Sequence, residues 1–201
     1  DLKDFAAHLH LSPESRLATF RAMIEQYINQ SVEALQALPV PVVAQVRGAC
    51  AGFGLSLVLG CDMVVAADSA YFTTAYASIA LSGDGGVSWF LPRILGRRKA
   101  FELLLLADRF GADEALRLGV VNRVVPPEEL EAATDALVQR FVKGPREAYA
   151  EMKRLLVASP EQSLSAQLQL EAEAFARSSA RPNFDEGIRA FLDKRKPGFN
   201  A

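Results

Sequence analysis

Apolar residues recur every three or four positions through the first forty residues of the chain. These residues are Leu17, Phe20, Ile24, Ile28, Val32 and Leu35. Their spacing places them on one face of a helix. Ser12 and Pro13 provide an N-cap and the proline favoured at the first helical position, and prolines at 39 and 41 end the segment. The pattern therefore predicts an amphipathic helix of about 25 residues.

Shorter apolar runs follow, and their lengths are typical of strands. They cover residues 40–46, 62–68 and 70–74. Turn residues bound the first two runs, which are rich in β-branched side chains. A glycine-rich segment with room for about two helical turns separates these two runs. The sequence GDGG at residues 83–86 then marks a loop before another apolar segment. Strands that alternate with helices predict an α/β fold.

The pattern changes after residue 125. Pro126 and Pro127 open a stretch rich in helix-forming residues, and the acidic residues directly after them suit the positive end of a helix dipole. Later prolines at 145, 160 and 182 divide this stretch into separate helices. We therefore expect an α/β core over residues 1–125 and a helical region for oligomerisation over residues 126–201.

Composition narrows the class of protein. Half of the 201 residues are hydrophobic and 23% are charged, so the chain is too apolar to be disordered. A formal net charge of -2 gives no broad basic field for nucleic acid, and no apolar run is long enough to span a bilayer. Cys50 and Cys61 suit free thiols in a reducing compartment, and His8 and His10 lack partners at metal-ligand spacing. We expect a cytoplasmic protein without nucleic-acid, membrane or metal partners.

Residues 46–68 contain three glycines at positions where many functional sites carry reactive side chains. Their sequence is VRGACAGFGLSLVLGCDMVVAAD. Gly48, Gly52 and Gly54 do not follow the order of a dinucleotide fingerprint, and the lysine of a phosphate loop is absent. Two interpretations are open. The glycines permit close packing of a turn against a helix, or they let a ligand oxyanion reach main-chain N–H groups.

Four segments together resemble the enoyl-CoA hydratase/isomerase, or crotonase, family over essentially the whole chain. They are PVVAQVRGACAGFGLSLVLGCDMVVAAD, IALSGDGGVSWFLPRILG, DEALRLGVVNRVVPPEEL and EGIRAFLDKRKPGF. The resemblance implies a spiral of β-β-α units with a helical C-terminal region, assembled as a homotrimer or a dimer of trimers. It also implies an acyl-CoA thioester as substrate, with coenzyme A as part of that substrate and no separate cofactor.

Members of this family hold the thioester oxygen between two backbone N–H groups. The resemblance assigns one of these groups to Phe53, next to Gly52, and places the other just before Asp1. We therefore expect the first strands of the core to lie upstream of this chain.

Three further residues resemble groups that hold coenzyme A. Lys3 resembles a lysine near the phosphates, while Phe191 and Lys194 resemble the aromatic residue and the lysine at the nucleotide end. The alternative is that the lysines are solvated charges and that Phe191 is a core residue of an amphipathic helix.

The carboxylates near the oxyanion decide which reaction follows. Typical hydratases of the family place glutamates at the positions of Ser56 and Tyr76. A serine hydroxyl without a partner base cannot activate water comparably. Hydration is therefore disfavoured, and we expect Ser56 and Tyr76 to shape or polarise the substrate pocket.

Asp84 is the remaining candidate acid/base. Its loop, SGDGGVSWFLPRILG, resembles the P-D-x-G-G-S loop in which isomerases of the family shuttle a proton along the acyl chain, although Gly83 and Val87 depart from that pattern. We expect apolar neighbours such as Trp89 to line the pocket and to favour the proton-carrying form of the carboxyl. The alternative is a simple turn residue.

These residues together predict an acyl-CoA isomerase that moves a proton or a double bond through an oxyanion-stabilised enolate. An enoyl-CoA hydratase is one alternative. A non-catalytic subunit that binds acyl-CoA is another.

Overall fold

A long helical segment precedes the first strand, as the apolar spacing predicted. This computed structural model describes residues 2–200, and Asp1 lies outside them. The helical elements before the sheets are α1 (Leu2–Ala6), α2 (Pro13–Met23), the π-helical segment η1 (Ile24–Asn29) and α3 (Gln30–Ala37). Ser12 caps α2, since its Oγ accepts a hydrogen bond from the Ser15 N–H at 3.2 Å. The last three elements are continuous, so the predicted helix is confirmed, with a π-helical middle that was not predicted.

Within residues 2–200, short strands form two three-stranded sheets. One sheet has the order β1 (Val43–Val46), β3 (Met63–Ala67) and β6 (Arg123–Val125), and the other has the order β2 (Ala49–Ala51), β4 (Tyr71–Thr73) and β5 (Phe110–Gly111). All neighbours are parallel except β4 and β5. Strands β1, β3 and β4 confirm the three apolar runs. Strand β2 was not predicted, because its Ala-Cys-Ala sequence has no strand pattern.

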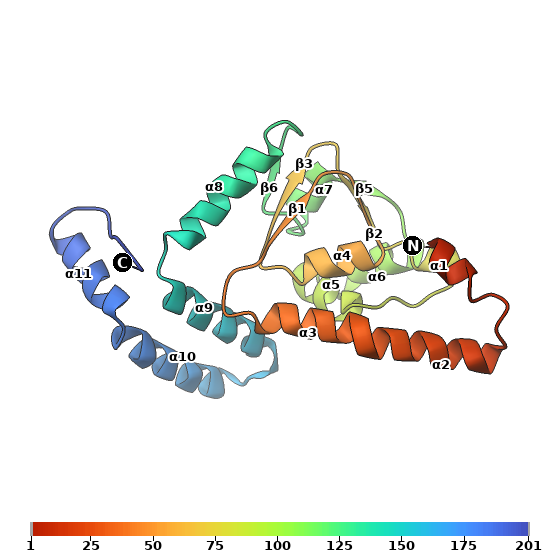
Figure 1. Cartoon of the computed structure of the whole chain (residues 1–201), viewed down its shortest axis with the longest axis horizontal. Helices are drawn as coiled ribbons and strands as arrows, with labels where there is room; N and C mark the ends of the chain where they lie inside the picture. Colours follow the sequence, from red (N-terminus) through yellow and green to blue (C-terminus); the bar gives the residue numbers. More distant parts are fainter. Residues whose placement is uncertain (1, 201) are drawn as a thin grey trace.

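The first four strands alternate between the two sheets, and β5 then stays in the sheet of β4 before β6 returns to the other sheet (Figure 1). The first unit is β1, β2 and α4 (Phe53–Leu59), and the second begins with β3 and β4. The next elements are η2 (Ala77–Ile79), α5 (Val87–Leu95), α6 (Arg97–Leu106) and, between β5 and β6, α7 (Ala112–Arg117). Leu55, Phe72 and Leu91 bury their side chains completely in the core between these elements. The succession is the spiral of β-β-α units that the resemblance implies.

The last third of the chain is helical, as predicted. It contains α8 (Leu130–Val142), α9 (Arg146–Ala158), the 3-10 turn η3 (Ser159–Glu161), α10 (Leu164–Ser179) and α11 (Pro182–Leu192). Leu130 of α8 packs with Val65 of β3 and Val125 of β6 in a small second core. From α9 onward the helices form an arm that leads away from the sheets (Figure 1).

A buried lysine connects this arm to the sheets. Lys153 of α9 is 7% exposed, and its Nζ donates to Asp62 Oδ2 at 2.8 Å and to the carbonyl oxygens of Leu35 and Val40 at 3.1 and 3.3 Å. Asp62 Oδ2 also accepts a hydrogen bond from the Val42 N–H at 2.7 Å. The ammonium group has three hydrogens, and all three are used. Asp62 therefore connects α9 to the segment before β1.

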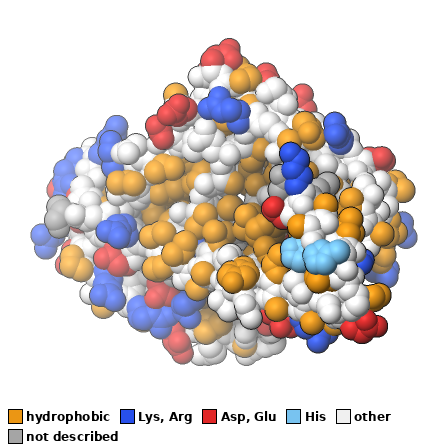
Figure 2. All heavy atoms as spheres, turned by 45° about the vertical axis from the view of Figure 1, so that its right-hand side comes forward, with side chains coloured by type: hydrophobic (Ala, Val, Ile, Leu, Met, Phe, Trp, Pro, Cys, Tyr) orange, Lys and Arg blue, Asp and Glu red, His pale blue; other side chains and the backbone are white. Residues whose placement is uncertain are grey.

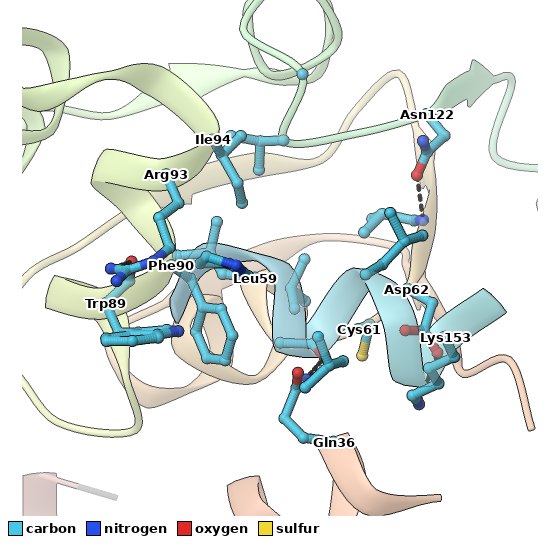
Figure 3. Close-up of a pocket in the computed structure, with 18 of the residues that line it drawn as sticks. Gln36, Leu59, Cys61, Asp62, Trp89, Phe90, Arg93, Ile94, Asn122 and Lys153 are labelled. Carbon is cyan, nitrogen blue, oxygen red and sulfur yellow. Dashed lines mark hydrogen bonds and ion pairs between the residues drawn. The ribbon is translucent and has the colours of Figure 1, made fainter. Parts of the chain in front are cut away.

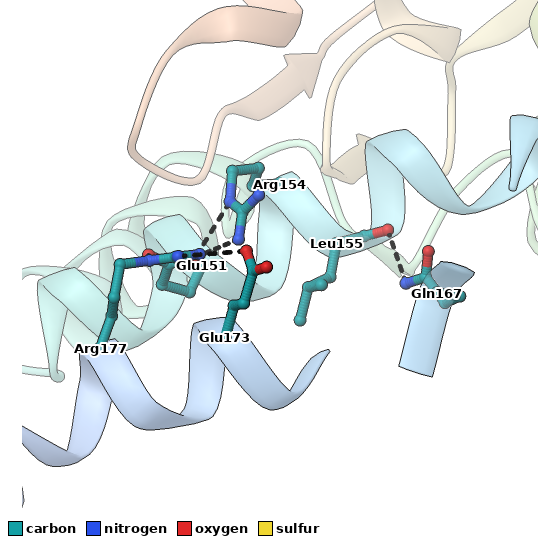
Figure 4. Close-up of polar contacts among 6 residues, drawn as sticks. All are labelled: Glu151, Arg154, Leu155, Gln167, Glu173 and Arg177. Carbon is teal, nitrogen blue, oxygen red and sulfur yellow. Dashed lines mark hydrogen bonds and ion pairs between the residues drawn. The ribbon is translucent and has the colours of Figure 1, made fainter. Parts of the chain in front are cut away.

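An ion-pair cluster joins α9 to α10 (Figure 4). Arg177 Nε of α10 donates to Glu151 Oε1 of α9 at 2.8 Å, and Arg154 Nη2 donates to Glu151 Oε2 at 2.9 Å. Nearby, Gln167 Nε2 donates to the Leu155 carbonyl oxygen at 3.2 Å. The hydrogen bonds from the two arginines to Glu151, that from Arg177 contributing most, lower the pKa of Glu151 from 4.5 to about 2.

Two classes of feature are absent from the part of the chain that the structure describes. No helix there is long and apolar enough to cross a bilayer. Nor does any group of three or more His, Cys, Asp or Glu side chains there form a candidate metal site.

The lowered pKa of Glu151 predicts a loss of stability in acid. Its contribution should be present above pH 4.5 and lost as the pH falls toward about 2, because the unfolded chain then binds a proton that the folded cluster excludes. Thermal melts between about pH 6 and about pH 2.5 should show a shallower fall in melting temperature for Glu151→Gln than for the wild type. At neutral pH this variant should melt about 2–4 °C lower.

Glu173→Gln is the matched control, because Glu173 is mostly exposed and lies 3.7 Å from Arg177. It should follow the wild-type curve. Identical pH slopes for Glu151→Gln and the wild type would contradict the prediction.

Candidate functional site

The turn into α4 exposes backbone N–H groups. Gly52 has φ +54° and ψ −126°, a conformation that L side chains rarely adopt, and its N–H donates to the Thr73 carbonyl oxygen at 3.2 Å. The N–H groups of Leu55 and Ser56 donate to the Gly52 carbonyl oxygen at 3.0 and 3.1 Å. The Phe53 N–H comes before these bonds at the start of the helix, where amides lack an intrahelical acceptor. This geometry agrees with the second interpretation of the glycines.

A second tight turn, directly after β4, positions Tyr76. The Tyr76 N–H donates to the Thr74 carbonyl oxygen at 2.8 Å across Ala75, whose φ is +57°. Such a γ-turn with positive φ is uncommon and strained. Thr73 Oγ1 accepts a hydrogen bond from the Ala75 N–H at 3.2 Å, and Thr74 Oγ1 donates to the Leu103 carbonyl oxygen at 2.8 Å. The hydroxyls of the two threonines that precede Ala75 therefore fix the turn.

Tyr76 links two other predicted site residues. Its hydroxyl donates to Asp84 Oδ1 at 2.6 Å and shares a 2.9 Å hydrogen bond with Ser56 Oγ. Ser56 is fully buried, Tyr76 is 6% exposed and Asp84 is partly buried. Burial raises the pKa of the Tyr76 hydroxyl far above its ordinary value, and the hydrogen bond to Asp84 raises it further. Tyr76 therefore stays protonated at neutral pH and donates to the carboxylate.

The glycines beside Asp84 let its loop close onto α4. Gly85 has φ +58°, and a Cβ added there would lie 2.7 Å from Phe53 Cδ2 and 2.9 Å from Ser56 Cβ. A Cβ added at Gly83 would lie 2.8 Å from Val87 Cγ1. Only a residue without a side chain allows this approach, so the loop carries Asp84 to the turn that presents the Phe53 N–H.

An apolar hollow of about 640 Å³ is lined in part by the segment that precedes this loop. Ile79 and Leu81, from the segment between Tyr76 and Asp84, form one part of its wall. The rest of the wall comes from α1, α2 and the segment between them: Phe5, Ala6, Leu9, Pro13, Arg16, Leu17 and Phe20. Figure 2 shows hydrophobic side chains gathered on this face near the histidines, which belong to the same N-terminal segment.

Trp89 lines a different hollow, of about 610 Å³ (Figure 3). The Arg93 guanidinium stacks on its indole, with Cζ 3.2 Å from the ring centroid. Lys153 and Ile94 line the same hollow. The structure therefore groups Trp89 with these residues, whereas Phe53, Ser56, Tyr76 and Asp84 form one cluster.

The three residues that resemble coenzyme A ligands lie far apart in one chain. Lys3 is in α1, while Phe191 is in α11 and Lys194 follows that helix. These helices lie at opposite ends of the molecule (Figure 1). Phe191 is 81% exposed, so it is not the core residue of the alternative interpretation.

Sequence reasoning found the members of the cluster but not their connection. Ser56, Tyr76 and Asp84 were each singled out by position, and nothing in the sequence indicated that Tyr76 would join the other two. The ion pair between the buried Lys153 and Asp62 was also missed, because an isolated lysine on an amphipathic helix gives no signal.

The chain belongs to the enoyl-CoA hydratase/isomerase family. The model of that family matches residues 4–201. A solved enoyl-CoA hydratase from Polaromonas sp. JS666 has 36% sequence identity and a TM-score of 0.91, with 100% of this chain and 76% of that chain covered. The fold is therefore crotonase-like.

Curated relatives include both kinds of enzyme. The chain is 39% identical over 168 residues to a probable enoyl-CoA hydratase of Rhodobacter capsulatus, covering 84% of this chain and 65% of that protein. It is 35% identical over 176 residues to the 1,2-epoxyphenylacetyl-CoA isomerase of Escherichia coli, covering 88% of this chain and 67% of that protein. It is also 32% identical over 198 residues to the crotonyl-CoA hydratase of Syntrophomonas wolfei, covering 98% of this chain and 76% of that protein. The chain thus spans about two thirds of the length of the first two relatives.

The contact at Gly85 predicts that Gly85→Ala will disturb the site. The new Cβ must displace Phe53 or the loop, and the residue would be strained at φ +58°. In the full-length protein we expect turnover to fall by about 10- to 100-fold, because small displacements of catalytic groups are costly. The melting temperature should fall by a few degrees, the usual scale of overpacking.

Gly111→Ala is the matched control, since an added Cβ there meets no heavy atom within 4 Å and the φ of Gly111 is −80°. Its turnover should stay close to wild type. Wild-type turnover in Gly85→Ala would show that the loop does not need this close approach.

Proposed function

We propose that the protein is an acyl-CoA isomerase in which Asp84 moves a proton along the acyl chain. The observation that carries this proposal is the pairing of Asp84 with Tyr76 at 2.6 Å, next to the turn that presents the Phe53 N–H. The isomerase from Escherichia coli among the relatives supports it.

The environment of Ser56 and Tyr76 argues against hydration. Adding water across a double bond needs one group to activate the water and another to protonate the carbon. The Ser56 hydroxyl is fully buried, and the Tyr76 hydroxyl is bonded to both Ser56 and Asp84. Asp84 is then the single carboxylate of the cluster. One carboxylate suffices for isomerisation, because the proton that it removes from one carbon is the proton that it returns to another.

The proposed reaction begins when the Asp84 carboxylate removes a proton from a carbon of the acyl chain. The electron pair of the broken C–H bond delocalises onto the thioester oxygen, and the Phe53 N–H donates to this developing oxyanion. Asp84 then returns the proton at another carbon of the conjugated system, and the double bond moves. Nothing is consumed apart from the starting isomer.

The apolar hollow bounded by Ile79 and Leu81 is the proposed site of the acyl chain. These two residues precede the loop of Asp84 in the chain, and the lining of the hollow is hydrophobic except for Arg16. Lys3 is the proposed contact of the coenzyme A phosphates. Because α11 lies at the other end of the molecule, Phe191 and Lys194 can contact the same coenzyme A only from a neighbouring subunit.

We propose that the protein assembles as a trimer or a dimer of trimers, and that it is located in the cytoplasm. The helices of the arm expose large apolar side chains, among them Leu164, Phe175 and Phe191. Such a surface is more extensive than a free monomer usually carries. Light scattering of the full-length protein at micromolar concentration should give the mass of three or six chains, and a monomeric mass would contradict the assembly.

Asp84→Asn tests the role of the carboxylate. In the full-length protein, binding of acyl-CoA esters should be nearly unchanged, because it depends on backbone amides and contacts with the nucleotide. Isomerase turnover should fall by roughly two to four orders of magnitude, the usual effect of losing a positioned general acid/base. Ser56→Ala and Tyr76→Phe should each cost much less.

Asp68→Asn is the control, because Asp68 is an exposed aspartate between β3 and β4. Turnover of Asp84→Asn within about threefold of wild type would eliminate Asp84 as the shuttle. A panel of enoyl-, dienoyl- and epoxyacyl-CoA esters separates the alternatives: water addition would identify a hydratase, and binding without turnover would identify a non-catalytic subunit.

A further inference from the structure

The hydrogen bonds around Tyr76 have a single consistent direction. A tyrosine hydroxyl has one hydrogen, and Tyr76 gives it to the Asp84 carboxylate at 2.6 Å. The 2.9 Å bond between Tyr76 and Ser56 must then be donated by Ser56. The other acceptor near Ser56 Oγ is the Gly52 carbonyl oxygen, at the longer distance of 3.5 Å. The direction is therefore from Ser56 to Tyr76 to Asp84.

We infer that Tyr76, supported by Ser56, is a positioning residue that orients the Asp84 carboxylate for proton transfer. Tyr76 holds Oδ1, and in the described part of the chain no hydrogen bond is made to Oδ2. Oδ2 is thus the oxygen that exchanges the proton of the substrate. This inference rests on the proposed role of Asp84 and adds a specific function for the two hydroxyls.

The burial of the two hydroxyls supports an indirect role. Ser56 is fully buried and Tyr76 is 6% exposed, so both act on the substrate through Asp84. The strained turn at Ala75 fixes the tyrosine from one side. From the other side, an added Cβ at Gly83 would lie only 3.5 Å from Tyr76 Cδ2, so the loop of Asp84 packs directly on the ring. Linked hydrogen bonds in such a site strengthen one another.

A double-mutant cycle of Tyr76→Phe and Ser56→Ala tests this inference in the full-length protein. The assay is isomerisation of the acyl-CoA ester that the wild type converts fastest. Tyr76→Phe should lower kcat by about 10- to 100-fold, the effect of losing a hydrogen bond to a charged group, with KM within about twofold. Ser56→Ala alone should lower kcat by about three- to fivefold, as expected for a neutral hydrogen bond. In the Tyr76→Phe background, Ser56→Ala should have almost no further effect on kcat.

Tyr71→Phe is the matched control, because Tyr71 lies at the start of β4 and its ring contacts Arg109. Its kcat should equal that of the wild type. Melting curves check that each variant folds. If Tyr76→Phe does not fold, the predicted loss of kcat in Ser56→Ala tests the same inference.

Different results overturn the inference and the proposed function. Independent, multiplying effects of the two substitutions would overturn the linked arrangement, and so would a Tyr76→Phe effect confined to KM. A large loss of turnover in Asp84→Asn with normal kcat in Tyr76→Phe would overturn the positioning role alone. Normal turnover in Asp84→Asn would overturn the proposed function together with the positioning role.

Discussion

The contacts of the buried Lys153 with Asp62 and two carbonyl oxygens are the constraint on which the arrangement of the chain depends. One ammonium group contacts the end of α3, the segment before β1 and the start of β3, three regions distant from α9 in sequence. A buried charge is tolerated only when its partners are complete, and here each hydrogen of Nζ has an acceptor. These contacts therefore hold α9, the first helix of the arm, against α3 and the segments before β1 and β3.

The same contact positions α4, because Asp62 lies just beyond the end of that helix. A fixed α4 presents the Phe53 N–H at one end and Ser56 one turn later. The Asp84 loop then closes on this turn through Gly85 and is held by Tyr76. The site is thus assembled from a helix start, a strained turn after a strand and a glycine loop, each from a different part of the spiral.

The sequence predicted features that depend on local patterns. The spacing of Leu17, Phe20 and Ile24 specified a helix, and β-branched runs specified β1 and β3. Resemblance supplied Phe53 and Asp84 as site residues. The contacts of Lys153 with Asp62 join residues 91 positions apart, and the pairing of Tyr76 with Ser56 joins residues 20 positions apart. Such pairings follow from tertiary packing, which neither periodicity nor composition records.

Two hydroxyls in place of two carboxylates change what the site can do. Two glutamates can divide the work of activating water and protonating carbon, whereas Ser56 and Tyr76 stay neutral at physiological pH. The raised pKa of Tyr76 keeps its hydroxyl protonated, so the hydroxyl donates to Asp84 while its oxygen accepts from Ser56. A pair of neutral donors behind Asp84 favours an ordered carboxylate, which suits a group that takes and returns one proton. In the proposed function, the hydroxyls adapt a crotonase-like site to proton transfer within the substrate.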